Sequence, residues 1–395
     1  MYLGRLVNAV PIGIAATLIP VYQSEYAPAT CRGSLISIYT WFIDAGAVTA
    51  TGVIYHTYAK TDTGAWKIVM GLQMIFAILI LATLPMIPES PRWLCMKGRR
   101  DEALAVLQSL RTTEETAELE LLDIEAALEV HNNDSSWADL FRGANLRRTI
   151  ISVAIPVIEA WQGLSFIGNY LVVFFISLGS TNVYELVLLI NSCLLITITF
   201  FFWAPDYFGR RGMLMFGSLV MFISIFTTAG VAGHDASNVG KTRQTVAVAM
   251  LFIWAIVYSS TWANLTWVTI AEISTTKLKA KTNGMAYFAQ SASSLVITFV
   301  SPYMQDSGYG NMGPYIGFFF GSFSFIGFLF VYFCFPETKG ASIEDLDMFF
   351  EQKLSIKDFG NAPRGAHEIQ GIVVDLELGG EAAKQMREKT SEVQS

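Results

Sequence analysis

Residues 186–233 read LVLLINSCLLITITFFFWAP (186–205), DYFGRR (206–211) and GMLMFGSLVMFISIFTTAGVAG (212–233). Two long apolar segments without any Asp, Glu, Lys or Arg are joined by six residues that hold three charges. A helix needs about 20 apolar residues to cross the hydrocarbon core of a bilayer. This stretch therefore predicts two membrane-spanning helices joined by a short charged turn.

The same pattern recurs along the chain. Only 15% of the 395 residues are charged and 53% are hydrophobic, whereas a soluble domain carries about 25% charge. One further stretch is interrupted only by Asp44, and the apolar run from Thr149 contains one carboxylate, Glu159. We predict an all-α membrane protein with nine spans; buried helices of a soluble protein would need far more polar surface. The charge-free stretches are Leu6–Ser24, Ile68–Pro88, Ala160–Tyr184, Leu186–Pro205, Gly212–Gly233, Gln244–Ala271, Thr282–Gln305 and Ser307–Pro336, with Gly33–Tyr58 as the ninth span.

The charged residues gather in two segments. Residues 89–148 and 337–395 together hold 39 of the 59 charged side chains, which predicts a polar loop and a polar tail. With both on the cytosolic side, that side holds 21 of the 26 Lys and Arg residues, a strong positive-inside bias. We therefore expect a multi-pass protein of the plasma membrane with a cytosolic carboxyl terminus and an external amino terminus. The net charge of −7 and the lack of a basic block argue against a nucleic-acid partner.

No motif for catalysis or for a cofactor is found in the sequence. The four cysteines and four histidines lack metal-ligand spacing. There is also no phosphate-binding glycine loop and no nucleophile elbow. We predict no metal, no cofactor and no enzymatic activity.

Charges at defined spacing lie in the short predicted cytosolic connections. Glu25 and Arg32 are seven residues apart, and so are Glu272 and Lys279. Opposite charges at helix ends, with Gly and Pro nearby, favour ion pairs that lock one side of a helical bundle. Ordinary positive-inside flanking charge is the alternative interpretation.

These connections carry a family resemblance. Pro88-Glu-Ser-Pro-Arg-Trp-Leu94, Asp206-Tyr-Phe-Gly-Arg-Arg211 and Pro336-Glu-Thr-Lys-Gly340 resemble signatures of the sugar porters in the major facilitator superfamily. With Gly4-Arg5 and residues 20–33, the resemblance runs in order to about residue 350, and within the family it is nearest the fungal hexose and α-glucoside permeases. It implies a gating set of Glu25, Arg32, Glu89, Arg92, Asp206, Arg210, Arg211, Glu272 and Lys279.

The resemblance also implies an architecture. The family has two six-helix halves around a central cavity that opens alternately to each side. Matched by motif, the first span here corresponds to the family's fourth, so the first three are expected to be absent. We expect residues 1–88 to be a three-span remnant, 89–148 a cytosolic loop, 149–336 a complete six-helix bundle and 337–395 a mostly disordered tail. Within the loop, leucine spacing predicts amphipathic helices at Gly98–Arg111 and Thr113–Val130, which brace the two halves in this family.

The implied substrate site departs from the family pattern. A position that is often Gln is Thr40 here, and the usual Gln-Gln-x-x-Gly-x-Asn becomes Glu159 to Ser165. Because each hydroxyl of an enclosed sugar needs a partner, the pocket is expected to take another polyol, a glycoside or something less polar. The implied substrate-binding set is Thr40, Asp44, Glu159, Ser165, Asn169, Trp267 and Gln290.

Two carboxylates lie within predicted spans. Thr40 and Asp44 share one helix face, so Asp44 faces the cavity if Thr40 does. Intramembrane carboxylates tend to mark ion or substrate pathways. In proton-coupled relatives an aspartate on the first helix titrates against the arginine that corresponds to Arg5. Without that helix, Asp44 and Glu159 either carry protons or simply bind neighbouring polar groups.

Three functional hypotheses remain. The first is a monomeric transporter that moves a sugar-like solute, with or without protons, by alternating access. The second is a non-transporting sugar sensor, although residues 337–395 are short and acidic compared with sensor tails. The third is the inactive product of a truncated gene model.

Overall fold

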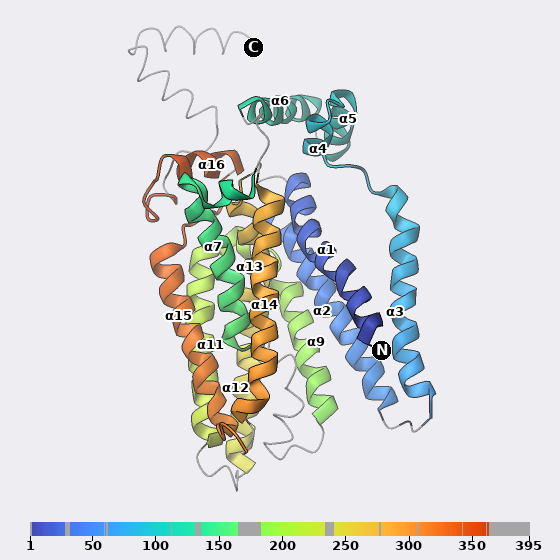
Figure 1. Ribbon diagram of the computed structural model, residues 1–395, viewed down its shortest axis with the longest axis vertical. Coiled ribbons are helices and arrows are strands. Elements are labelled where there is room, and N and C mark those ends of the chain that lie inside the picture. The colour runs from blue at the N-terminus through green and yellow to red at the C-terminus, as the bar shows by residue number, and fades with distance from the viewer. Residues whose placement is uncertain are drawn as a thin grey trace.

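A computed structural model describes residues 2–27, 32–58, 60, 62–111, 113–130, 136–164, 183–233, 241–275, 278–305, 308–341, 343–360 and 362. Every regular element in these ranges is helical (Figure 1). The long helices run side by side in a bundle, while the short helices α4, α5, α6 and α16 gather at one end, which we call the α16 end.

The bundle has two unequal parts. The first contains α1 (Tyr2–Tyr26), α2 (Arg32–Thr57) and α3 (Gly64–Thr83), the last followed by a short turn at Leu84–Met86. The second contains α7 (Gly143–Glu159), α9 (Val183–Phe201), α11 (Arg210–Gly233), α12 (Lys241–Ser260), α13 (Trp262–Ile273), α14 (Lys279–Gln305) and α15 (Ile316–Cys334).

The two parts meet where α1 and α2 pack against helices of the second part. Helix α2 packs against α9 and α13, and α1 packs against α14. Within the second part α11 packs against α15 and α12, and α7 packs against α14. The main apolar core lies in this second part, where the buried Trp262 side chain donates from Nε1 to the Ser218 hydroxyl at 2.9 Å.

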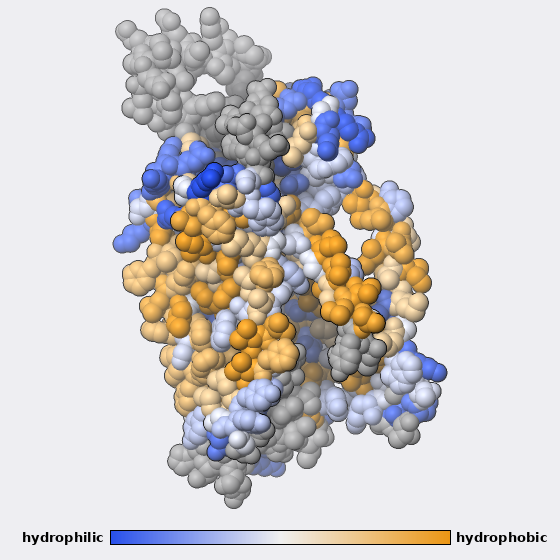
Figure 2. Space-filling model, viewed as in Figure 1, coloured by the Kyte–Doolittle hydropathy of each residue, from blue (hydrophilic) through white to orange (hydrophobic). Residues whose placement is uncertain are grey.

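The surface is that of a protein surrounded by lipid. Six of the described helical segments are long and apolar enough to cross a membrane: Leu6–Tyr26, Trp66–Met86, Val183–Phe201, Arg210–Ala232, Lys241–Ile273 and Gly313–Cys334. Large apolar side chains cover the middle of the bundle, and polar ones gather mainly at its ends (Figure 2). Helices α2 and α14, with 26 and 27 residues, are also long enough to cross a membrane, but they carry more polar side chains than those six segments.

One predicted span is described only in part. The apolar run from Thr149 lies on α7, which begins at Gly143 and ends at Glu159 and is followed by a π-helical turn at Ala160–Leu164. The Glu159 carboxylate, which was predicted to lie within a span, is satisfied inside the bundle. Residues 165–182 lie outside the described part of the chain.

The polar loop contains the two predicted helices and one more. Helices α5 (Arg100–Leu110) and α6 (Glu114–Val130) confirm the amphipathic prediction, and Leu107 and Leu121 are buried between them. Helix α4 (Pro91–Met96) was not predicted. These helices contact one another and α1; their role as a brace between the halves stays a prediction.

The first part of the predicted tail is folded. Helix α16 (Ile343–Glu351) packs against α7 and α13, and the side chains of its Phe349 and Phe350 and of Phe359 after it are buried. Arg148 on α7 forms an ion pair with Asp347 and stacks on the Phe350 ring. The expectation of disorder overlooked this helix; residues 363–395 lie outside the described part.

Helix α11 packs so closely at Gly217 that we expect a larger side chain there to destabilise the protein. A Cβ at this position would overlap the Thr261 side chain, because its Cβ atom would lie only 2.7 Å away. We expect Gly217→Ala to lower the free energy of unfolding by about 1–3 kcal/mol, measured by titration with a denaturing detergent. Gly71→Ala on α3 is the matched control, since nothing lies within 4 Å of its added Cβ, and it should be neutral or stabilising by up to about 1 kcal/mol. Equal losses in both variants would contradict this packing argument.

Candidate functional site

A cavity of about 920 Å³ lies between the two parts of the bundle. Its lining comes from α1, α2, α7, the turn after α7, α9, α12, α13 and α14. Most lining side chains are apolar, with a few convergent polar groups, as is usual for small-molecule sites. The polar and aromatic lining residues are Tyr39, Thr40, Asp44, Glu159, Asn191, Trp254, Tyr258, Trp267, Tyr287, Gln290, Ser291 and Ser294.

The structure places the described members of the predicted substrate set in this one cavity. Thr40, Asp44, Glu159, Trp267 and Gln290 all line it, although they come from four different helices. Thr40 and Asp44 share one face of α2, as their spacing predicts. Ser165 and Asn169 lie outside the described residues.

Glu159 is the most firmly held polar group in the cavity. It ends α7 and is buried, with 2% of its surface exposed. The Tyr258 hydroxyl donates to its Oε1 at 2.7 Å, and the Gln290 Nε2 donates to its Oε2 at 3.1 Å. The carboxylate therefore links α7 to α12 and α14 across the wall of the cavity.

The backbone that follows Glu159 leaves the α-helical path. Gly163 has φ +110°, in the region that favours glycine, and it lies in the π-helical turn Ala160–Leu164. Such turns are frequent at functional sites because they re-aim the side chains around them. Here the turn ends α7 at the cavity wall and contributes Leu164 to the lining.

Asp44 is placed differently from Glu159. It also lines the cavity, but its Oδ2 is buried and has no hydrogen-bond partner among the described residues. One turn earlier, the Thr40 hydroxyl donates to the Ala263 carbonyl at 3.5 Å. Of the two carboxylates in the cavity, Asp44 is thus the one with an oxygen that accepts no hydrogen bond from a described residue.

Aromatic rings complete the lining in two groups. Trp254 and Tyr258 on α12 stack with their centroids 5.0 Å apart. Trp267 on α13 meets Tyr39 and Tyr287, each at 5.9 Å between centroids. Trp267 lines the cavity, and its role in stacking on a solute stays a prediction. Trp254 and Tyr258 carry no local sequence signal of a binding site.

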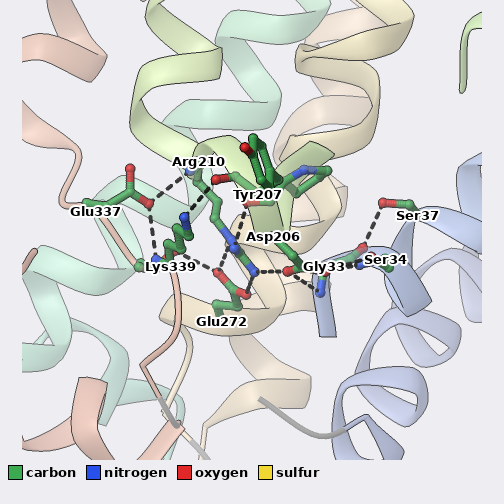
Figure 3. A network of polar contacts seen from close by, with 11 residues as sticks. Gly33, Ser34, Ser37, Asp206, Tyr207, Arg210, Glu272, Glu337 and Lys339 are labelled. Carbon is green, nitrogen blue, oxygen red and sulfur yellow. Dashed lines mark hydrogen bonds and ion pairs between the residues drawn. The ribbon is translucent and has the colours of Figure 1, made fainter. Parts of the chain in front are cut away.

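A second polar cluster closes the bundle near the α16 end (Figure 3). Its centre is Arg210, with 1% of its side chain exposed, whose Nη2 lies 2.9 Å from Asp206 Oδ1 and 2.7 Å from Glu272 Oε1. Its Nη1 donates to the Pro205 carbonyl at 2.8 Å. We call Asp206, Arg210, Glu272, Glu337 and Thr338 the Arg210 network.

The Arg210 network holds the first part of the bundle to the second. Asp206, on α10 (Ala204–Phe208), accepts from the Ser34 amide at 2.8 Å, the Ser34 hydroxyl at 2.7 Å and the Gly33 amide at 3.2 Å. These groups belong to the first turn of α2, where a carboxylate satisfies amides that lack helical partners. A Cβ on Gly33 would lie 2.5 Å from Asp206 Oδ1, so this approach depends on a glycine.

Residues after α15 complete the Arg210 network. Glu337 accepts from the amides of Arg210 at 2.9 Å and Arg211 at 3.1 Å, and the Thr338 hydroxyl donates to Glu272 at 2.7 Å. Gly209 has φ +86°, and a Cβ there would lie 2.7 Å from Glu337 Oε2. The Pro336 to Gly340 motif drew attention to Glu337 and Thr338, but nothing in the sequence showed that they pair with Arg210, Arg211 and Glu272.

The other predicted gating residues lie around this network or apart from it. Glu25 accepts from the Ser90 hydroxyl, and the Tyr26 hydroxyl donates to the Glu89 carbonyl at 2.7 Å. These contacts join α1 to the segment just before α4, and Arg92 lies in the first turn of α4. Arg211 donates to the Tyr332 carbonyl at 2.8 Å, and Lys279 is buried at the start of α14. The side chains of Arg5 and Arg32 lie outside the described part of the structure.

Metal binding finds no support here. Within the described ranges there is no group of three or more His, Cys, Asp or Glu side chains that could hold a metal ion. The described lining offers groups that accept hydrogen bonds and aromatic rings that can stack on a flat ligand face.

Comparisons with known proteins identify relatives of this chain. Two curated relatives from Saccharomyces cerevisiae are the high glucose sensor RGT2, 28% identical over 89% of this chain, and the low-affinity glucose transporter HXT1, 28% identical over 92%. The chain spans 47% and 66% of the lengths of these two proteins, so it covers less than two thirds of each.

Solved structures show the fold. The proton:xylose symporter XylE bound to 6-bromo-6-deoxy-D-glucose has a TM-score of 0.77 at 23% identity, covering 88% of this chain and 73% of that one. An inward-open conformation of XylE from E. coli has a TM-score of 0.59 at 22% identity, covering 84% and 68%. The fold is thus that of the major facilitator superfamily, as the motifs predicted.

The family assignment rests on the largest match. The family described as sugar (and other) transporter matches residues 1–350, which include the cavity, the Arg210 network and each motif that carried the resemblance. The match makes this chain a multi-pass membrane protein of a transporter family and not an enzyme. The chain therefore belongs to the sugar (and other) transporter family of the major facilitator superfamily.

Proposed function

We propose that this protein moves a sugar or a related polyol or glycoside across the plasma membrane by alternating access. The observation that carries the proposal is the cavity itself. It lies between the two parts of the bundle, combines hydrogen-bonding groups with aromatic faces, and is separated from the α16 end by the Arg210 network. Opening that network while closing the opposite end would expose the same cavity to the other side.

The topology forms part of this proposal. Nine helices span the membrane, three in residues 1–88 and six in residues 149–336, and the α16 end is cytosolic because Lys and Arg concentrate there. Residues 89–148 then form a cytosolic loop and 337–395 a cytosolic tail. The chain resembles ligand-bound XylE more than inward-open XylE, with TM-scores of 0.77 and 0.59, which supports a state closed on the cytosolic side.

The solute would bind between α2 and the helices α7, α13 and α14. Thr40, Asp44, Glu159 and Gln290 offer donors and acceptors, and Trp267 offers a flat face for a sugar ring. Ser165 and Asn169 belong to the proposed set by family resemblance alone. Because Glu159 and Thr40 replace amides of the family pattern, a common hexose would not find all its usual partners.

Uptake measurements test this function. The protein is expressed in a host that lacks its own sugar carriers, surface expression is quantified, and radiolabelled hexoses, polyols and glycosides are supplied one at a time. Uptake of at least one solute, saturable and above that of the empty host, is expected. No uptake of any solute despite surface expression would defeat the transporter proposal.

A sensor is the second candidate function, because RGT2 is described as a high glucose sensor. If the protein is a sensor, the purified protein should bind a sugar. Vesicles that contain it should nevertheless take up no more sugar than empty vesicles. Binding without transport in reconstituted vesicles would therefore favour this alternative.

Proton coupling makes a further prediction at Asp44 and Glu159. The titratable groups that line the cavity are these two carboxylates and the tyrosines Tyr39, Tyr258 and Tyr287; no Lys, Arg or His is among the described lining residues. If the carboxylates carry protons, uptake should fall as the external medium becomes more alkaline, because fewer of them are protonated. Asp44→Asn should remove that dependence while the amount of protein at the surface stays unchanged.

The control for this measurement is Glu185→Gln, which removes an exposed carboxylate on α9 outside the cavity. This variant should keep the pH dependence of the unaltered protein. A pH dependence that persists in both Asp44→Asn and Glu159→Gln would rule out proton carriage by these two groups and leave them as hydrogen-bonding residues.

A further inference from the structure

The lining of the cavity has an unbalanced charge. It contains two carboxylates, Asp44 and Glu159, and none of its described lining residues is Lys, Arg or His. A pocket for a neutral sugar needs hydrogen-bonding groups but no net charge. An intramembrane pocket with two acids and no built-in base is suited to a ligand that supplies positive charge.

The two carboxylates differ in how many of their oxygens already accept a hydrogen bond. Glu159 already accepts from Tyr258 and Gln290, one bond to each oxygen. Asp44 Oδ2 is buried without a partner in the described part of the chain, and a buried polar group without a partner is costly. A ligand group that donates to Asp44 would remove that cost, and a cationic donor would also neutralise the charge.

Aromatic faces lie beside these acids. Tyr258, which donates to Glu159, lines the same cavity as Asp44 and stacks on Trp254. Cations are attracted to the faces of Trp and Tyr rings, most strongly where water is excluded. The second aromatic group, Trp267 with Tyr39 and Tyr287, comes from α13, α2 and α14 and lines the same cavity, where it offers a surface for a ring with apolar C–H faces.

We propose that the solute of this cavity is a polyol that carries a protonated amine, with an amino sugar as the representative class. The ammonium group donates to Asp44 and lies against Trp254 and Tyr258, while the sugar ring stacks on Trp267. This inference rests on the proposed function and narrows its substrate. It is also compatible with proton coupling, because a proton and an ammonium group compete for the same Asp44 oxygen.

Three matched probes test the inference by equilibrium binding to the purified full chain. D-glucosamine carries the ammonium group, N-acetyl-D-glucosamine keeps the nitrogen without the charge, and D-glucose has a hydroxyl there. Binding is followed by intrinsic tryptophan fluorescence, since Trp254 and Trp267 line the cavity. At a pH where the amine is protonated, glucosamine should bind about tenfold to a hundredfold more tightly than N-acetylglucosamine, the range expected for a charge-assisted hydrogen bond.

Variants locate the charge that gives this preference. Asp44→Asn should bring the affinity ratio of the two probes close to one, and Asp44→Glu should restore a preference for the amine. Glu185→Gln should keep the ratio of the unaltered protein, because its carboxylate is on the surface. Thermal unfolding of each variant verifies that it is folded. If Asp44→Asn does not fold, the affinity ratio is measured in Asp44→Glu instead.

The outcomes separate this inference from the proposed function. Equal affinity for glucosamine and N-acetylglucosamine, or an unchanged ratio in Asp44→Asn, overturns the amine inference while sugar binding still stands. If Glu185→Gln loses the affinity ratio as fully as Asp44→Asn does, the preference comes from surface charge. That result also overturns the amine inference. Failure of all three probes to bind overturns the amine inference, whereas the transport proposal is tested separately by the uptake of hexoses, polyols and glycosides.

Discussion

Arg210→Gln is expected to lower the free energy of unfolding by about 3–5 kcal/mol, the range for breaking a buried ion pair by removing one partner. The guanidinium is 1% exposed and lies between Asp206 and Glu272, of which Glu272 is 3% exposed. Glutamine cannot neutralise two carboxylates at once. Their repulsion would then act at the point where α10 and α13 meet the first turn of α2.

The neighbouring arginine is the control for this prediction. Arg211 is only partly buried, and its guanidinium donates to the Tyr332 carbonyl at 2.8 Å and lies 5.9 Å from the Tyr332 ring. Arg211→Gln should therefore cost no more than about 1 kcal/mol. Both values are measured by titration of the purified protein with a denaturing detergent. Similar losses in the two variants would contradict a special role for the buried charge cluster.

The membrane-spanning helices were predictable because lipid imposes a simple rule on sequence. Six described segments are long and apolar enough to cross a membrane, and charges collect in the turns between helices. Glu159 was predicted to lie within a span, and the structure shows how it is accommodated there, because it receives hydrogen bonds from Tyr258 and Gln290.

Helix α16 was missed although the sequence contained a signal for it. Leu346, Phe349 and Phe350 have the i, i+3, i+4 spacing of one helix face, and all three are buried. The acidic composition of residues 337–395 concealed this pattern, because an average over the whole segment does not show a short amphipathic stretch.

The partners within the site could not be predicted from spacing. Tyr258 lies 99 residues after Glu159, and Ser34 lies 172 residues before Asp206. Local periodicity carries no information about such contacts, which depend on how whole helices pack. Family motifs marked Asp206, Arg210 and Glu272 as a set, but only the fold shows that Asp206 binds the first turn of α2 from the other part of the bundle.

That contact leads to the second large prediction, that Asp206→Ala opens the α16 end of the bundle. The substitution removes three hydrogen bonds to Gly33 and Ser34 and one ion pair to Arg210. Hydrogen bonds to charged groups contribute about 1.5–3 kcal/mol each. Loss of even one such contribution between the two parts would shift the equilibrium towards the open state by about tenfold or more.

The opening can be measured at Ser37, which is fully buried one turn after Gly33. In a background with the four native cysteines replaced by serine, Ser37→Cys should react at least about tenfold faster with a water-soluble maleimide when Asp206→Ala is added. Asp206→Asn should have a smaller effect, because asparagine keeps an oxygen that accepts from the α2 amides but loses the charge that pairs with Arg210. Ser109→Cys on the exposed face of α5 corrects for differences in reagent and pH. An unchanged rate at Ser37→Cys would mean that the Asp206 contacts do not hold this end closed, and alternating access would then need a different gate.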